Sequence, residues 1–385
     1  MKKTLLLAAG LMLAGSAMAQ VNEPTLTLDW TITDNMPAST NARWGAAYGG
    51  KFYLNEKTVG FYSYSAENGT KTTIEGVKVD GTGFNFDGVG NALFTNYFPG
   101  TSGECMKNLV LWKASTGTTS ILTISDEDLT SLGYVGARMD FIGRGVGDIF
   151  SATGGAFFFA NGTDTEGAKK ILKVYITNGE LDMTKTKVLD APASADNGTI
   201  VIPMTNDPAS DDVVFRYRSN YNGKYGQFQY HNGTKWVAYT DASTKPSATS
   251  GGDIIMLDGM LFTIEPTGSN YYDGWQIVER NTNTVVASVA ESSGTQYKNA
   301  TSYGTVLTAE KVSENVANIY HYHHGLYIKK YTFETPKDYL TAIEEVEADA
   351  NAPVEYYNLQ GVKVANPEKG LFIKKQGNKA TKVVL

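Results

Sequence analysis

Three of the four histidines in this chain fall in one short stretch, "IYHYHHGLYIKKY", at residues 319–331. His321 and His323 stand two residues apart, so they would share one face of a β-strand and could together ligate a metal ion such as zinc. No third ligand stands near them in the sequence. His324 precedes Gly325, and His tolerates the positive φ of a tight turn better than most residues. We therefore interpret the three histidines as strand and turn residues and assign no metal ligand.

The single cysteine and several carboxylates are the other candidates for catalysis. Cys105 is the only cysteine, so the chain forms no internal disulfide, and no histidine base can be placed beside this thiol. Asp87, Asp140, Asp148 and Asp258 occur in glycine-containing segments, where turn formation is the expected role. Two carboxylates facing each other across a pocket would suffice for glycoside hydrolysis, but their separation in space does not follow from the sequence.

Other signatures of catalysis or cofactor binding do not occur in the sequence. The glycines of "GRGVGD" (residues 143–148) lie among predicted strands, whereas a phosphate-binding loop leads into a helix N-terminus. No Ser-His-Asp, zinc or EF-hand pattern is present. We therefore assign no catalytic residue and no cofactor.

Aromatic residues gather in three long segments, at 95–108, 219–226 and 265–275. Tyrosine offers a flat apolar face with a polar edge, which suits contact with a sugar ring or a protein surface. Long loops on a rigid scaffold often carry function. The predicted ligand-binding residues are Tyr97, Phe98, Tyr221, Tyr225, Tyr271 and Tyr272. The alternative is that these rings pack over the edges of sheets.

The elements that would position these loops repeat along the chain. Each copy has an aromatic or β-branched strand, a tight turn and a second alternating strand. The copies lie at residues 60–76, 108–124, 171–189, 225–240, 274–290 and 318–334. Asn68-Gly69 and Asn178-Gly179 occupy the turn in two copies, and His324-Gly325 is expected to occupy it in the last.

A further pair of strand-like segments precedes each copy, which makes about four strands per unit. We predict an all-β fold, a β-propeller with six blades as the preferred count, over residues 20–335. The segment "TLTLDWTI" (residues 25–32) is an extra strand that could complete the last blade. Seven blades or a double-sheet sandwich are the alternatives.

The first 19 residues have the features of a secretory signal peptide. Lys2 and Lys3 precede an apolar run from Leu5 to about Ala14, and Ala17-Met18-Ala19 provides the cleavage site. No later segment is long and apolar enough for a transmembrane helix. The expected location is secreted, periplasmic or on the cell surface.

Removal of the peptide leaves 31 basic and 40 acidic residues, a net charge of −9, which disfavours nucleic acid as a partner.

The composition changes after the repeats. Residues 336–352 are an acidic linker, and residues 353–385 are predicted to be a small β module with three short strands. The Tyr357-Asn358-x-x-Gly361 turn, the "GLFIKK" strand and the terminal Lys-Val-Val strand resemble the C-terminal tails of secreted Bacteroidetes proteins. These tails include the sorting domain read by the type IX secretion system. The repeat region likewise resembles uncharacterised propeller-like secreted proteins of these bacteria. The resemblance implies export or surface anchoring and implies no activity.

Two classes of function follow. The preferred one is a noncatalytic binding protein that recognises a glycan or a cell-surface protein. The alternative is a propeller-fold polysaccharide hydrolase or lyase that uses paired carboxylates in the central channel. The two differ in whether such carboxylates meet in the channel, or whether Tyr, Asn and Thr line it instead.

Overall fold

In the computed structural model, the structure describes residues 23–37, 41–42, 44–81, 83–95, 109–136, 142–163, 169–191, 200–216, 228–231, 234–239, 252–267, 274–290, 305–336, 339, 353–357, 363–364, 367, 371–376 and 379–384. One compact unit spans Pro24–Thr335, and a second contains Pro336–Leu385. The fold is all-β, as predicted, with one short helix, α2 (Asp126–Ser131), among the described residues. None of the described helices is long and apolar enough to cross a membrane.

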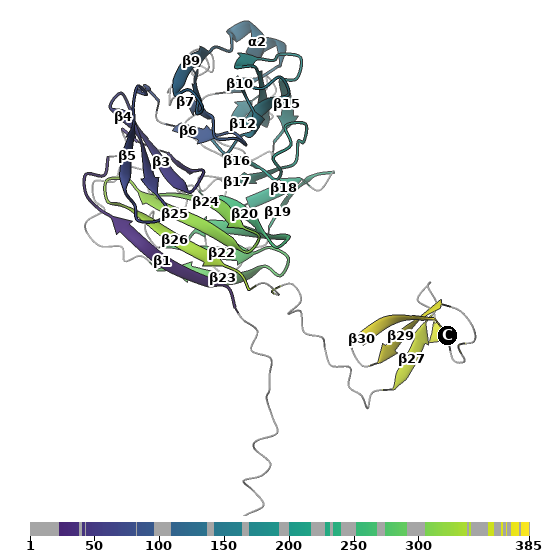
Figure 1. Ribbon diagram of the computed structural model, residues 1–385. Coiled ribbons are helices and arrows are strands. Elements are labelled where there is room, and N and C mark those ends of the chain that lie inside the picture. Colours follow the sequence, from purple (N-terminus) through teal and green to yellow (C-terminus); the bar gives the residue numbers. More distant parts are fainter. Residues whose placement is uncertain are drawn as a thin grey trace, which may run out of the picture. The chain divides into compact units, whose positions relative to one another are not determined.

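Six antiparallel sheets make up the described part of the first unit (Figure 1), and in five of them all strands are consecutive in the chain. The first sheet contains β2 (Gly45–Ala47), β3 (Lys51–Glu56), β4 (Gly60–Ser65) and β5 (Lys71–Ile74). The second contains β6 (Gly83–Phe86), β7 (Ala92–Thr95), β8 (Leu109–Lys113) and β9 (Thr118–Leu122). The third contains β10 (Val135–Gly136), β11 (Val146–Asp148), β12 (Gly154–Thr163), β13 (Lys169–Thr177), β14 (Glu180–Leu181) and β15 (Lys187–Asp190).

The next two sheets have four strands each. The fourth contains β16 (Ile200–Pro203), β17 (Val213–Arg216), β18 (Phe228–His231) and β19 (Trp236–Ala238). The fifth contains β20 (Asp253–Leu257), β21 (Met260–Pro266), β22 (Trp275–Glu279) and β23 (Thr284–Val289). The predicted repeat of four strands therefore holds in these sheets, while in the third sheet β14 and β15 both pair with β13.

The sixth sheet joins the two ends of the first unit. It contains β24 (Thr305–Ser313), β25 (Val316–His323), β26 (Tyr327–Glu334) and β1 (Thr25–Ile32). The predicted extra strand at residues 25–32 is β1, and it pairs antiparallel with β26 as the outer strand. The hairpin at residues 318–334 therefore supplies the second and third strands of its sheet. In the other copies, by contrast, the repeated hairpin forms the third and fourth strands.

Burial decreases from the first strands of the sheets to the last. All residues of β16, β17 and β21 are buried, so these strands are covered on both faces by neighbouring sheets. The outer strand β5 has three exposed residues out of four, and β9 has four out of five. This gradient explains why the inner segments are continuously apolar, whereas the outer segments are rich in Thr, Lys and Ser.

Tight turns connect several of the strands. Asn178 and Gly179 have φ values of 54° and 79°, as a type I′ turn requires, which confirms the turn predicted there. The turn at His324-Gly325 also forms, but only Gly325 has a positive φ, of 69°. The expectation that His324 would adopt positive φ was wrong. The turn extends over three residues, and the Leu326 N–H donates to the His323 carbonyl at 3.1 Å.

The second unit contains one described antiparallel sheet. Its strands are β27 (Val354–Tyr357), β28 (Lys363–Val364), β29 (Leu371–Gln376) and β30 (Lys379–Val384), in the order β28-β27-β29-β30. The chain therefore forms four strands here, one more than the sequence pattern predicts. Lys363 forms an ion pair with Glu355 at 2.5 Å across the β27–β28 hairpin.

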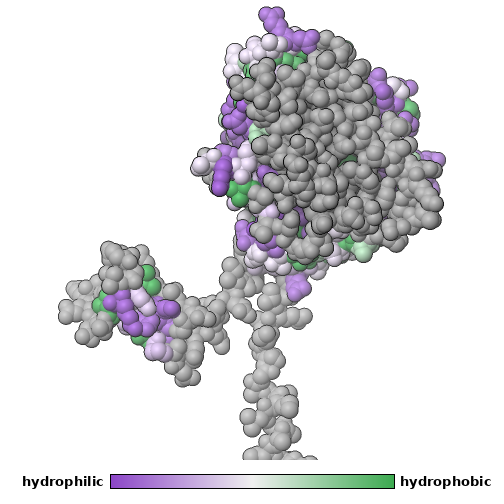
Figure 2. Space-filling view, turned by 180° about the vertical axis from the view of Figure 1, so that it is seen from behind, coloured by the Kyte–Doolittle hydropathy of each residue, from purple (hydrophilic) through white to green (hydrophobic). Residues whose placement is uncertain are grey.

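The described surface carries no large apolar patch on the face seen in Figure 2, where hydrophobic residues are small separate spots among hydrophilic ones. The exposed large hydrophobic side chains lie on separate elements, and they are Leu28, Val59, Val89, Ile121, Val312 and Val354. Single exposed hydrophobic side chains of this kind are ordinary on a protein surface.

Candidate functional site

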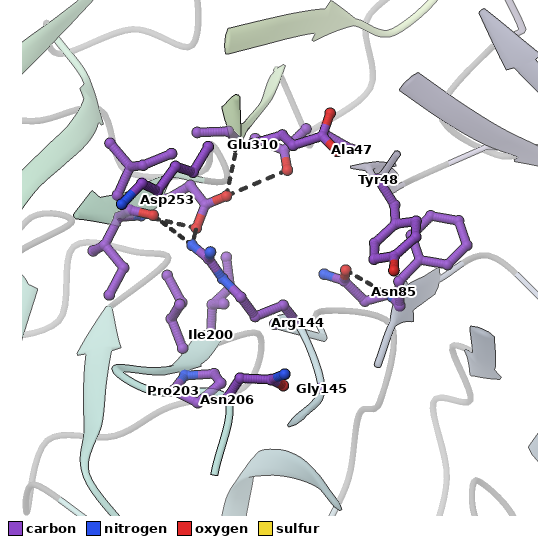
Figure 3. Close-up of a pocket in the computed structure, with 18 of the residues that line it drawn as sticks. Ala47, Tyr48, Asn85, Arg144, Gly145, Ile200, Pro203, Asn206, Asp253 and Glu310 are labelled. Carbon is purple, nitrogen blue, oxygen red and sulfur yellow. Dashed lines mark hydrogen bonds and ion pairs between the residues drawn. The ribbon is translucent and has the colours of Figure 1, made fainter. Parts of the chain in front are cut away.

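The first strands of five sheets, together with the segment at residues 143–145 that leads into β11 of the third sheet, line one pocket with a volume of about 380 Å³ (Figure 3). This volume falls in the range of small-molecule sites in proteins, about 300–1,000 Å³. Apolar side chains such as Ile200, Ile202 and Leu307 form part of the wall. The polar and charged groups that line it are Tyr48, Asn85, Asp87, Arg144, Thr205, Asn206, Asp253, Thr308, Glu310 and Lys311.

An ion pair joins two sheets that are not consecutive in the chain. Arg144 precedes β11 of the third sheet, and its Nη2 donates to Asp253 Oδ1 on β20 of the fifth sheet at 2.6 Å. The same guanidinium also donates to the Ile254 carbonyl. Asp253 Oδ2 accepts the Ala309 N–H of the sixth sheet at 2.9 Å. This buried carboxylate thus ties three sheets together around the pocket.

Asp87 has a comparable role between the second and third sheets. Its carboxylate accepts the N–H groups of Val89 and Asn91 at 3.0 and 2.8 Å, as expected for a turn former. It also accepts the Ile149 N–H of the next sheet at 3.0 Å and the Asn91 side-chain amide at 2.9 Å. Burial raises the pKa of Asp87, while these hydrogen bonds oppose that rise. The predicted turn role of Asp87 is confirmed.

Glu310 on β24 links the sixth sheet to the first. Both of its carboxylate oxygens lie 3.0 Å from the Gly50 N–H, which belongs to the turn between β2 and β3. Gly49 and Gly50 have φ values of 59° and 71°, so this turn directs its N–H groups toward the carboxylate. Burial raises the pKa of Glu310, while the Gly50 and Gly49 N–H groups act in the opposite direction.

Tyr48 forms an aromatic part of the pocket wall and directly precedes Gly49 and Gly50 in the turn that contacts Glu310. Its ring packs against Phe86 with centroids 5.5 Å apart, and Gly90 leaves room for it because a Cβ there would overlap the ring. Burial, followed by the negative charges of Asp87 and Glu310, raises the pKa of Tyr48. The phenol therefore remains neutral and presents a fixed ring to the pocket.

The pocket carboxylates thus all accept hydrogen bonds from the protein itself. Each oxygen of Asp87, Asp253 and Glu310 accepts at least one hydrogen bond from a neighbouring protein group. Neither a pair of catalytic carboxylates nor a lining of Tyr, Asn and Thr alone describes this pocket. It combines three carboxylates with all three of those residue types. The arrangement is suited to holding a polar ligand. The three carboxylates connect neighbouring sheets through their hydrogen bonds.

The predicted aromatic binding residues are not among those that the structure describes. Tyr97, Phe98, Tyr221, Tyr225, Tyr271 and Tyr272 all lie outside the described residues, as do Cys105 and Asp140. The three segments that carry these aromatic residues join the second and third strands of their sheets. Tyr48, Asn206 and Glu310 lie at the opposite end of the sheets, where first strands lead into second strands.

Of the polar residues that line this pocket, sequence reasoning considered Asp87 as a candidate carboxylate, with turn formation as its expected role, and selected no ligand-binding residue. The usable signal was the repeat itself, because the first strand occupies the same place, lining the pocket, in five of the six sheets. Polar residues in those segments, such as Asn85, Asp253 and Glu310, stood out from apolar neighbours. Their convergence depends on which sheets face one another across the pocket.

The histidines occupy the positions predicted for strand residues. Tyr320 and Tyr322 face the first sheet, where the Phe52 ring lies 5.4 and 6.2 Å from theirs. His321 points to the other face, with its ring 6.2 Å from that of Trp275. In the described part of the chain, no group of three His, Cys, Asp or Glu residues is arranged to hold a metal ion.

Comparisons with known proteins concern the fold alone. No protein-family model and no curated protein matches the chain. A DUF4623 family protein from Bacteroides eggerthii is similar in structure, with a TM-score of 0.50 and 12% identity, over 82% of this chain and 76% of that one. The WD40 β-propeller domain of Doa1 has a TM-score of 0.42 and 10% identity, over 82% and 99% of the two chains. YCF48 bound to D1 peptide has a TM-score of 0.38 and 10% identity, over 92% and 97%.

Proposed function

We propose that this protein is an exported, noncatalytic binding protein that recognises a glycan through the central pocket of a six-bladed β-propeller. The observation that carries the proposal is the state of the pocket carboxylates. Asp87, Asp253 and Glu310 are all hydrogen-bonded to protein groups, and Asp253 is also ion-paired with Arg144. A hydrolase needs a free acid and a free base or nucleophile facing the substrate.

Closure of the ring is part of this proposal. The pairing of β1 with β26 places the first described strand of the unit in the same sheet as its last three strands. Hydrogen bonds of Glu310 with Gly50, and of Asp253 with Ala309, connect successive sheets at the pocket. Radial repetition of this kind leaves few sheet edges exposed, which favours a rigid binding scaffold.

Export and retention at the cell surface complete the proposal. The basic and apolar residues at 1–19 act as a signal peptide, and residues 353–385 act as an anchoring or sorting module. The acidic segment at 336–352 acts as a linker between that module and the propeller. A glycan or a surface protein is the class of partner that such a location provides.

The alternative is a polysaccharide hydrolase or lyase, and one observation favours it. Glu310 lines the pocket and burial raises the pKa of its carboxyl group, a property of general acids. The binding role has the stronger support because both Glu310 oxygens accept the Gly50 N–H, which holds the side chain in the turn of the adjacent sheet.

The test uses the mature chain, residues 20–385, on a glycan array together with analysis of soluble products. Thr205 is exposed and lines the pocket, so Thr205→Trp should obstruct it. Thr72→Trp, on the exposed outer strand β5, is the matched control. We expect Thr205→Trp to weaken glycan binding about tenfold or more while the control binds normally.

Product analysis separates the two functions. Binding without release of shorter saccharides supports the proposal. Release of products by the wild type but not by Glu310→Gln would establish the enzyme instead. Binding that is insensitive to Thr205→Trp would remove the pocket from the proposal and favour the aromatic segments containing Tyr221 and Tyr271.

A further inference from the structure

We propose that Glu310 and Tyr48 form a subsite for the protonated amino group of an amino sugar. This inference rests on the proposed glycan-binding function and specifies the chemistry of the ligand. It depends on the balance of charge in the pocket, the fixed position of the carboxylate and the adjoining aromatic ring.

The pocket is lined by one partly exposed carboxylate, that of Glu310, which has no cationic partner among the described residues. Arg144 is paired with Asp253 at 2.6 Å, and Lys311 is paired with Glu314 at 2.8 Å. Asp87 is buried, with 2% of its surface exposed, and is enclosed by backbone and amide donors. Among the described residues, no ion pair joins Glu310 to a lysine or arginine. A cationic ligand would therefore complete the charge balance of the site.

The carboxylate of Glu310 is already in position to receive such a group. Its two contacts with the Gly50 N–H fix the orientation of the side chain and occupy only part of its acceptor capacity. The charged form is disfavoured by burial, as the raised pKa of Glu310 indicates. An ammonium group at this point would stabilise the charged form through a charge-assisted hydrogen bond.

The Tyr48 ring supplies the second element of recognition. Tyr48 stands two residues before Gly50, whose N–H donates to Glu310, and its ring packs against Phe86 with centroids 5.5 Å apart. Figure 3 shows the two residues lining the same pocket. An aromatic face attracts a cation and also packs against the apolar face of a sugar ring.

An amino sugar fits the remaining lining better than a lysine side chain does. Thr205 and Asn206, which are both exposed, add a hydroxyl and an amide group that can bind sugar hydroxyls. A lysine side chain presents methylene groups at these positions and would leave the polar groups without ligand partners. The pocket therefore matches a ring that bears several hydroxyls and one ammonium.

The test is calorimetric titration of the mature chain with glucosamine, N-acetylglucosamine and Nα-acetyl-lysine amide. We expect glucosamine to bind, and N-acetylglucosamine, which lacks the positive charge, to bind at least about tenfold more weakly. Glu310→Gln should reduce glucosamine affinity about tenfold or more, because it removes the charge and keeps the shape. Tyr48→Leu should reduce it about threefold or more, while Tyr48→Phe keeps the ring and most of the affinity.

Glu67→Gln, which changes an exposed carboxylate on the β4–β5 turn, is the control and should bind as the wild type does. Thermal unfolding of each variant checks that a loss of binding is not caused by a loss of fold. Tyr48→Leu does not change the groups that form the hydrogen bonds between the Gly50 N–H and Glu310. Equal affinity for glucosamine and its N-acetyl form would overturn the inference. Binding of the lysine derivative in preference to glucosamine would overturn the assignment to an amino sugar.

Failure of this inference is distinguishable from failure of the proposed function. If array glycans bind in a Thr205-dependent manner but the amine makes no contribution, the pocket remains a glycan site and the Glu310 subsite is wrong. If neither glycans nor amines bind, the proposed function itself is rejected.

Discussion

Two buried histidines should make the stability of this fold sensitive to mild acid. His321 and His323 on β25 are 2% and 1% exposed. Burial lowers the pKa of His323 to about 4, and burial, followed by the charges of His323 and Lys329, lowers that of His321. In the unfolded chain both would have pKa values near 6.5. Between these limits the unfolded state binds more protons, so the free energy of unfolding rises with pH.

The size of the effect follows from the pKa difference. For His323, a change from about 6.5 to about 4 corresponds to roughly 3 kcal/mol of stability, present at neutral pH and lost as the pH falls through this range. Each histidine contributes a slope of up to about 1.4 kcal/mol per pH unit. Buried Asp87 and Glu310 act in the opposite sense because their pKa values are raised. Comparison of the wild type with a histidine variant cancels their contribution.

The assay is urea unfolding, followed by tryptophan fluorescence, at several pH values between about 5 and 7. His323→Gln should lower the slope of unfolding free energy against pH by about 1 kcal/mol per unit relative to the wild type. His231→Gln is the matched control, because His231 lies exposed on β18. An NMR titration of the folded wild type provides a second measurement that needs no variant.

One result would refute this reasoning. If the wild type and His323→Gln have the same slope, or if the His323 resonance titrates near pH 6.5 in the folded protein, burial does not keep this imidazole neutral. The strand would then expose His323 to water, contrary to its 1% exposed surface.

The remaining predictions concern the turns, the pocket and the two units. Gly69→Val should destabilise the fold by about 2 kcal/mol, because φ is 70° and a Cβ would lie 2.9 Å from Ile32 Cδ1. Gly117→Val has the same φ but open space around it, so urea unfolding should show a smaller loss. Asp253→Ala should cost about 3 kcal/mol by removing the charged partner of Arg144 and the acceptor of the Ala309 N–H, and equal stability would contradict the inter-sheet role. Deletion of residues 336–385 should preserve cooperative thermal unfolding, since Pro24–Thr335 is compact by itself, and loss of folding would reject this division.

Much of the architecture was accessible from local sequence patterns. Alternation of aromatic and polar residues predicted hairpins such as β4–β5 and β22–β23, because side chains of a strand alternate between two faces. The Asn178-Gly179 pair predicted the position of the turn between β13 and β14, because few residue pairs adopt two successive positive φ values. The extra strand at 25–32 was recognisable from the same alternation, and its partner followed from the incomplete last repeat.

Only the tertiary structure determined the pocket. Asp253 and Arg144 are 109 residues apart in the chain, and Glu310 and Gly50 are 260 apart. No local pattern specifies which inner strands face one another, because that depends on the number, twist and stacking of the sheets. The same packing explains why these acidic residues connect the sheets. A buried carboxylate is tolerated where backbone N–H groups of the neighbouring sheet donate hydrogen bonds to it. The sequence by itself therefore determined the repeating strands and turns, while the convergence of Glu310, Tyr48 and Asp253 arose from contacts between sheets.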